Sequence, residues 1–340
     1  MYDVQFLTSR YFKIFQGVYE DFRNNSHRDY KFEIEPLEYN EFIEYFSKGI
    51  IQCLILLEDG IPTGFLAFSS ADNLALELFV IHLIGEDDLK NKVIALAQEF
   101  LTQTVAIRTK RIASYPMLGK QKKYKDELKN LGFNFVDLGV MVYDINDYEN
   151  QKKLFESVND ELPIGFKLVN YSPEYFEGFS IALNSSFETS SDTNYDERFL
   201  TISGCIDIAK KLTDSIYGEF LPRASKLLIY EDKVVGFSLA NITAGTIANI
   251  PLVGIIPDFR GQKLSEIMLG ATLREIAYMI KAGELNLTEL NVTVDLANLS
   301  AYSMYKSLGF NEIYMYPQAY MPKTEIRETK EIIKEEENEG

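Results

Sequence analysis

The order of apolar and polar residues in this chain of 340 residues predicts alternating strands and helices. Short apolar runs between turn-forming residues predict strands, in the second half of the chain, at 226–230, 234–242, 246–256, 289–294 and 312–316. Apolar spacing and capping residues predict helices at 172–184, 206–212, 264–280 and 300–308. A long helix between two strands implies a parallel crossover, so this half is predicted to be an α/β domain.

The first half of the chain repeats landmarks of the second half. A strand-turn-strand segment around Glu58 recurs around Glu231, and the letters Leu-Gly-Phe-Asn around Gly132 recur around Gly309. The two offsets are nearly equal. Because the period is the size of a domain, we predict two copies of one domain rather than a solenoid.

A polar, charged stretch at 146–161 separates the two copies. We expect a first domain at 1–148 and a second at 160–320. The segment 321–340 is dominated by Glu and Lys and has too few apolar residues to pack, so we expect an acidic tail.

The composition bears on location and partners. A formal net charge of -17 disfavours nucleic acid, because such binding depends on Lys and Arg at phosphates. It favours solubility and, more weakly, a cationic small molecule or basic peptide as substrate. The apolar runs are too short to span a membrane, and the N-terminus lacks a signal pattern. Cys53 and Cys205 are expected to be buried and reduced, which suggests a cytoplasmic protein without a membrane partner.

The segment 252–265 is the first with candidate chemistry. A buried strand ends at Pro257, and a tight turn through Gly261 leads into the long predicted helix. Free backbone N–H groups and the positive end of the helix dipole form a phosphate site at such a start. Ser265 keeps the next turn small, and Arg260 can add a charge-assisted bond. An ordinary strand-to-helix connection is the alternative for this segment alone.

The segment 298–310 is the second segment with candidate chemistry. Asn298 precedes a predicted short helix, Tyr305 lies on its apolar face, and Gly309 is placed to end it. Taken singly, Asn298 also fits an ordinary helix cap, and Tyr305 fits a core aromatic residue.

Together and in this order, the two segments resemble two motifs of the GNAT N-acetyltransferase superfamily. The first is similar to its acyl-CoA-binding motif, and the second to its Asn-x-x-Ala-x-x-x-Tyr-x-x-x-Gly-Phe motif. The resemblance covers about residues 165–320. It implies an α/β (α+β) fold of two tandem GNAT-like domains, each a mixed, mostly antiparallel sheet flanked by helices with a splayed central strand pair. It also implies acetyl-CoA as co-substrate, no metal, and a small-molecule or peptide amine as acceptor.

The resemblance assigns roles to residues. Tyr305 would be the catalytic general acid for the departing CoA thiolate, since a phenol with a pKa of about 10 stays protonated at neutral pH. Asn298 would bind the pantetheine arm or order the helix beside it. The splayed strand would pair with that arm through the backbone of Val253, Gly254 and Ile255. The pyrophosphate turn would comprise Arg260, Gly261, Gln262, Lys263, Leu264, Ser265 and Glu266. The amine would attack the thioester directly.

Two positions depart from the family pattern. Lys263 stands where the family has its middle glycine; we expect helical backbone angles there and a charge that helps to bind phosphate. Thr293 takes the place of the acidic general base that some members have, and the sequence does not place the nearby Asp295 at the acceptor. A water relay and an amine that is already deprotonated both fit.

The first copy lacks the matching residues. Asp87 and Asp88 stand at the phosphate turn, where two carboxylates would repel the ligand. Gln121 and Leu128 take the places of the asparagine and the tyrosine. We therefore predict no cofactor site in the first copy, which would be structural or would wall the acceptor pocket.

We expect an N-acetyltransferase that moves an acetyl group from acetyl-CoA to a primary amine. The alternatives are a non-catalytic acyl-CoA-binding sensor or scaffold protein, and a structural dimerisation protein without a CoA site; a homodimer is compatible with all three. The polar stretch 184–223 is expected to face the acceptor. Its acidic residues would attract a cationic amine or form a solvated loop: Glu188, Asp192, Asp196 and Glu197.

Overall fold

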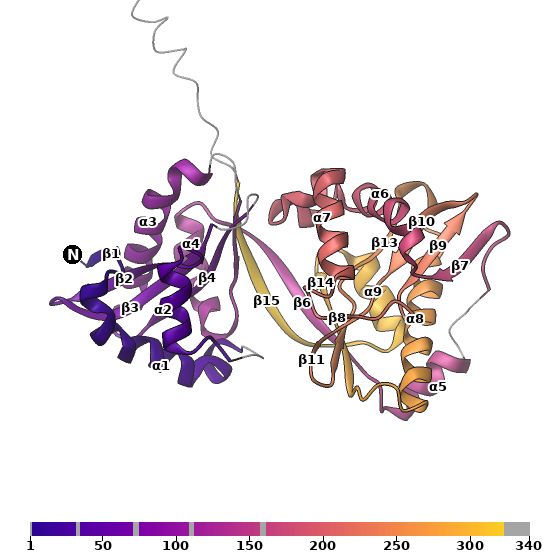
Figure 1. Ribbon diagram of the computed structural model, residues 1–340, viewed down its shortest axis with the longest axis horizontal. Coiled ribbons are helices and arrows are strands. Elements are labelled where there is room, and N and C mark those ends of the chain that lie inside the picture. The colour runs from indigo at the N-terminus through magenta and orange to yellow at the C-terminus, as the bar shows by residue number, and fades with distance from the viewer. Residues whose placement is uncertain (1, 32–34, 71–74, 109–111, 157–160, 323–340) are drawn as a thin grey trace, which may run out of the picture. The chain divides into compact units, whose positions relative to one another are not determined.

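The computed structural model describes residues 2–31, 35–70, 75–108, 112–156 and 161–322. They form two compact units (Figure 1): the first ends at Asn134 and also takes the chain from Ala319 onward, and the second runs from Phe135 to Gln318. Strands and helices are mixed along both, which confirms the predicted α/β (α+β) class.

The first unit is built on a sheet with the strand order β1-β2-β3-β4-β5. Neighbours among the first four strands are antiparallel, and β4 and β5 are parallel. The strands are β1 (Asp3–Phe6), β2 (Gln52–Glu58), β3 (Ile61–Ser69), β4 (Ala75–Leu83) and β5 (Ile112–Pro116). The helices are α1 (Phe12–Tyr30), α2 (Tyr39–Ser47), α3 (Leu89–Arg108) and α4 (Lys125–Asn130).

Buried tyrosines make this unit sensitive to alkaline pH. Tyr19, Tyr30 and Tyr115 are at most 3% exposed, and burial raises the pKa of each well above its ordinary 10.0, and that of Tyr124 to about 12. Folded phenols stay protonated while unfolded ones ionise. Above pH 10 the free energy of unfolding should therefore fall by about 1.4 kcal/mol per pH unit for each such tyrosine. Thermal unfolding from pH 8 to 11 checks this, and a constant melting temperature would contradict it.

The second unit contains strands of two sheets. One has the strand order β15-β6-β14-β12-β11-β8, and the other has the order β13-β10-β9-β7. The strands of the first are β6 (Asn134–Asp144), β8 (Glu219–Phe220), β11 (Asn241–Ala244), β12 (Ile247–Asn249), β14 (Glu289–Asp295) and β15 (Asn311–Met321). Those of the second are β7 (Phe166–Asn170), β9 (Lys226–Tyr230), β10 (Lys233–Ser238) and β13 (Val253–Ile255). The helices are α5 (Tyr148–Glu156), α6 (Phe176–Phe187), α7 (Ile202–Thr213), α8 (Leu264–Lys281) and α9 (Leu299–Leu308).

Three apolar clusters among the described residues hold the elements of the second unit. Leu269 and Leu273 of α8 are buried with Leu290 of β14. Phe179 of α6 and Phe237 of β10 belong to a second cluster, where their rings meet edge to face at 5.2 Å. The predicted helices at 264–280 and 300–308 are confirmed to within one residue as α8 and α9. Within the described residues, no helix combines the length and apolar character that crossing a membrane requires.

The compact units differ from the domain limits that the sequence suggests. β6, which the sequence places in the first domain, pairs with β14 from Leu138 to Asp144 and groups with the second unit. The expected boundary at 146–161 contains α5, whose Leu154 is buried and accepts a hydrogen bond from Arg274 at 3.2 Å. The sequence limits followed polarity, whereas the partner of a strand depends on contacts distant in sequence. β15 runs to Met321, inside the predicted tail, and residues 323–340 lie outside the described residues.

Candidate functional site

A cavity of about 630 Å³ opens in the second unit where two strands separate. Before Pro251 the chain pairs with β14, and the Ile250 amide donates to the Asn291 carbonyl at 2.9 Å. After Pro251 it pairs with β10, and the Leu239 amide donates to the Leu252 carbonyl at 3.0 Å. Proline has no amide hydrogen to offer to either strand. The single strand predicted at 246–256 is therefore two strands, β12 and β13, and the cavity lies between β13 and β14.

β13 is the edge strand of its sheet and turns part of its backbone toward the cavity. The Ile256 amide donates to β10 at 3.0 Å. Because backbone groups alternate along a strand, Gly254 also faces β10, and Val253 and Ile255 face the open edge. Gly254 is needed for packing, since a Cβ there would lie 2.5 Å from the ring of Phe237. An extended ligand could pair with this edge as an added strand.

The turn after β13 presents unpaired amides at the start of α8. In the part of the chain that the structure describes, the amides of residues 261–265 donate to no protein acceptor, whereas Glu266 donates to the Lys263 carbonyl at 3.1 Å. Gly261 has a positive φ of 80°, which suits a residue without a side chain. Free amides and the positive end of the helix dipole together favour an anion. Of the amides that the sequence assigns to the pyrophosphate, that of Glu266 is therefore not free.

Lys263 does not have the helical backbone angles that we expect from the sequence. It is the residue before the first turn of α8 and has φ 57° and ψ 16°, in the left-handed region. This is where the family pattern has glycine, because a side chain makes that conformation costly. Lys263 is exposed and lines the cavity, so its ammonium group adds positive charge beside the free amides.

Replacing Lys263 with glycine is expected to stabilise the fold and weaken anion binding. Lys263→Gly should raise the free energy of unfolding by about 0.5–1 kcal/mol, because relief of the left-handed strain exceeds the entropy that glycine loses. Lys263→Met is the control: it removes the charge and keeps the strain. Urea unfolding and CoA titration check both variants. Equal stability of the two would contradict this explanation.

Arg260 donates hydrogen bonds to two backbone carbonyls of the protein and so holds the turn in place. Its Nε donates to the Ile255 carbonyl at 3.0 Å, and its Nη2 donates to the Ser186 carbonyl at the end of α6 at 2.9 Å. The bond to a phosphate that the sequence suggests would thus use the N–H groups of Nη1 or the second N–H of Nη2. The main contribution of Arg260 is to join β13 and α6 at the mouth of the turn.

α9 brings two further predicted residues to the cavity. Asn298 caps this helix, because its side chain accepts from the Ala301 amide at 3.1 Å, and it is exposed at the cavity wall. Gly309 ends the helix with a φ of 106°, as predicted. Gln262 is exposed at the turn but does not line the cavity.

Tyr305 of α9 is buried and lines the cavity. It is 6% exposed, and its hydroxyl makes no hydrogen bond to any residue that the structure describes. Burial, and then the negative charge of Asp192, raise the pKa of Tyr305 above its ordinary value. The phenol therefore stays protonated at neutral and mildly alkaline pH and can donate its proton to a ligand.

Solved structures of similar fold align with nearly the whole of this chain. A GCN5-related N-acetyltransferase from Sphaerobacter thermophilus aligns with a TM-score of 0.60 and 13% identity, covering 96% of this chain and 98% of that chain. A tandem GNAT protein from the clavulanic acid biosynthesis pathway, described as without AcCoA, aligns with a TM-score of 0.54 and 11% identity, covering 96% and 99%. The chain has a tandem GNAT fold. A glucosamine N-acetyltransferase region of a fungal multi-domain GH3 beta-N-acetylglucosaminidase aligns with a TM-score of 0.58 and 11% identity, covering 94% of this chain and 38% of that one. The sequence matches no protein-family model and no curated protein.

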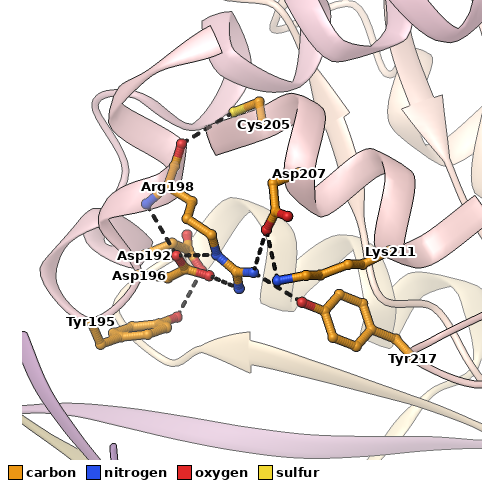
Figure 2. Close-up of polar contacts among 8 residues, drawn as sticks. All are labelled: Asp192, Tyr195, Asp196, Arg198, Cys205, Asp207, Lys211 and Tyr217. Atoms are coloured by element: carbon orange, nitrogen blue, oxygen red, sulfur yellow. Dashed lines mark hydrogen bonds and ion pairs between the residues drawn. The ribbon is translucent and has the colours of Figure 1, made fainter. Parts of the chain in front are cut away.

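In this GNAT fold, residues 189–192 and Phe199 form one wall of the cavity, and Arg198 fixes the segment between them (Figure 2). The guanidinium donates to both Asp196 oxygens, at 2.9 and 2.6 Å. It also donates to Asp207 of α7 at 3.2 Å and to Tyr217 at 2.9 Å. These bonds join the wall to α7, so that its backbone is held in place without a ligand.

The four acidic residues expected at the acceptor differ in their surroundings. Asp192 lines the cavity. Asp196 is neutralised by Arg198, Glu197 is buried, and Glu188 is exposed at the end of α6 away from the cavity lining. Of these four residues, Asp192 is therefore the one that lines the cavity.

Asp295, which the sequence does not place at the acceptor, also lines the cavity together with Thr293. Its carboxylate accepts from Ser191 Oγ at 2.5 Å and from the Ala297 amide at 2.9 Å. The sequence signal was ambiguous because alternation along β14 gives the side of a residue but not which loop covers that side.

Several cavity residues carry no sequence signal. The hydroxyls of Ser186 and Ser190 are buried without a partner among the described residues. The rings of Phe187 and Phe199 stack at 4.7 Å in the wall. They lie in or beside a loop without periodicity, so spacing could not identify them. Among the described residues, no group of His, Cys, Asp or Glu is placed to hold a metal ion.

In the first unit, the residues that correspond to Asn298 and Tyr305 are buried in the interior. Gln121 is fully buried, and its Oε1 accepts from the Ile81 amide of β4 at 3.1 Å and from the Tyr115 hydroxyl. Leu128, at the position of the tyrosine, is fully buried in apolar packing. Asp88 precedes α3 with a φ of 52° and presents a carboxylate rather than a phosphate site. That the first copy binds no acyl-CoA stays a prediction.

Proposed function

We propose that this protein is an N-acetyltransferase that transfers an acetyl group from acetyl-CoA to a primary amine. The observation that carries the proposal is Tyr305, a buried phenol without a partner among the described residues, in the same cavity as a row of unpaired helix-start amides. The GNAT fold and the N-acetyltransferase names of similar structures support this activity.

The cavity suits an acyl-CoA in charge and in backbone chemistry. Amides 261–265 and the ammonium group of Lys263 would bind the pyrophosphate. The open edge of β13 at Val253 would pair with the amides of the pantetheine arm. Asn298 would order α9 beside that arm through its cap.

The reaction follows from the groups around the thioester. A neutral amine attacks the carbonyl carbon and forms the C–N bond, and the C–S bond then breaks. Tyr305 gives its proton to the departing sulfur, and the proton that the nitrogen loses restores the phenol through water, so that the products are an amide and the free thiol. Most of the acceleration comes from holding amine and thioester in register.

Release of free thiol from acetyl-CoA tests this function against a panel of amines. Amine-dependent thiol release at a rate proportional to the enzyme concentration is the expected result. Tight CoA binding without turnover on any amine would instead indicate an acyl-CoA sensor. A melting temperature that saturating CoA does not raise would exclude both.

A further inference from the structure

Two carboxylates enter the cavity from different elements and lie close together. Asp192 comes from the wall segment between α6 and α7, and Asp295 comes from the end of β14. Ser191, the residue before Asp192, donates to the Asp295 carboxylate at 2.5 Å, which brings the two acidic residues to one region. Burial, and then the negative charge of Asp192, raise the pKa of Tyr195, whose hydroxyl donates to Asp192 at 2.7 Å; Asp295 adds a smaller contribution.

Neutral groups hold these carboxylates, so their charges are not balanced. Asp295 accepts from the Ser191 hydroxyl and the Ala297 amide, and one oxygen of Asp192 accepts from Tyr195. Within the described residues, no Lys, Arg or His lies in ion-pair distance of either, in contrast to Asp196 beside Arg198. Two like charges in a partly enclosed space repel each other and attract cations.

The cavity also has polar groups without partners among the described residues. Tyr305 is more than nine-tenths buried, lines the cavity and has no partner for its hydroxyl among the described residues, and it lies close enough to feel the charge of Asp192. Ser186, which is 6% exposed, also lines the cavity with an unpaired hydroxyl. Buried polar groups are normally satisfied in a folded protein, which points to a ligand in this cavity.

We propose that the acceptor is an alkyl diamine, with two ammonium groups at neutral pH, bound by Asp192 and Asp295. This inference rests on the proposed acetyl transfer. The reacting nitrogen must be neutral when it attacks, so a monoamine then leaves both carboxylates without a cation. A diamine keeps one ammonium group, which bonds to the oxygen of Asp192 that has no partner among the described residues. The phenol ring of Tyr305, which lines the cavity, adds a surface that favours a cation.

Calorimetric titration of diamines into protein saturated with CoA tests this without any turnover. The probes are the α,ω-diamines of three to five carbons and the monoamines of equal length. Wild type should bind its best diamine at least about 10-fold more tightly than the matched monoamine, as a charge-assisted hydrogen bond requires. Asp192→Asn, which keeps an acceptor for Tyr195, should lose most of that preference. Glu188→Gln, the same change at an exposed position off the cavity, should keep it.

The outcomes separate this inference from the proposed function. Equal affinity for diamine and monoamine in wild type, or an undiminished preference in Asp192→Asn, would overturn the diamine assignment. The affinity for CoA should be the same in all three proteins, which shows that the fold and the phosphate site are intact. If no amine releases thiol from acetyl-CoA, the proposed function fails, and the calorimetric comparison still decides whether Asp192 binds a diamine.

Discussion

Tyr305→Phe is expected to lower the kcat of amine-dependent thiol release by about 10²-fold or more, the usual contribution of a general acid. The affinity for CoA should change little, because phenylalanine keeps the ring that packs on Phe310 at 5.5 Å. Burial and the charge of Asp192 raise the pKa of Tyr305, so the wild-type kcat should not fall through loss of this proton as the pH rises from 7 to 9. Steady-state kinetics with saturating acetyl-CoA measure both effects.

Tyr302→Phe provides a matched control for that variant. Tyr302 lies one helical turn earlier on α9, outside the cavity lining, where a hydrogen bond to Glu312 raises its pKa. Its loss should leave kcat close to the wild-type value. The proton-donor role would be wrong if Tyr305→Phe kept full activity, or if both variants lost activity to the same extent.

The second large effect is expected from Ser265→Asp. Ser265 is the second residue of α8 and lines the cavity. A carboxylate there should bond to the free amides of the turn and stabilise the helix start by about 0.3–1 kcal/mol. It should also repel a pyrophosphate about 5 Å away by on the order of 3 kcal/mol, which lowers the affinity for CoA more than 100-fold. The variant should therefore be more stable and bind CoA less.

Ser203→Asp is the control for the expected gain in stability and loss of CoA affinity. Ser203 is the second residue of α7, is exposed, and lies outside the cavity lining. It should gain similar stability and bind CoA like the wild type. Thermal unfolding and calorimetric CoA titration are the two readouts. Unchanged CoA affinity in Ser265→Asp would place the pyrophosphate elsewhere.

The sequence predicted helices whose signals, an apolar face and capping residues, lie within a short stretch of the chain. α8 follows from its apolar face. α9 follows from its apolar face, the cap at Asn298 and the left-handed Gly309, all close in sequence. The two-copy arrangement follows from landmarks that recur in order, and the fold confirms it.

Contacts between distant segments were not predictable in the same way. The separation of β12 from β13 depends on two different partner strands on either side of Pro251. The placement of β6 depends on its pairing with β14. The left-handed angles of Lys263 contradict our expectation, because the needs of the turn override the preference of a single residue. Asp192 and Asp295 line the same cavity only because a segment without periodicity lies against the end of a strand, where Ser191 bonds to Asp295.

The structure of the protein with bound acetyl-CoA tests the central claim most directly. The account predicts pyrophosphate oxygens at the amides of residues 261–265 and the thioester sulfur within hydrogen-bond reach of the Tyr305 hydroxyl. A sulfur atom distant from Tyr305, or acetyl-CoA bound outside this cavity, would contradict it.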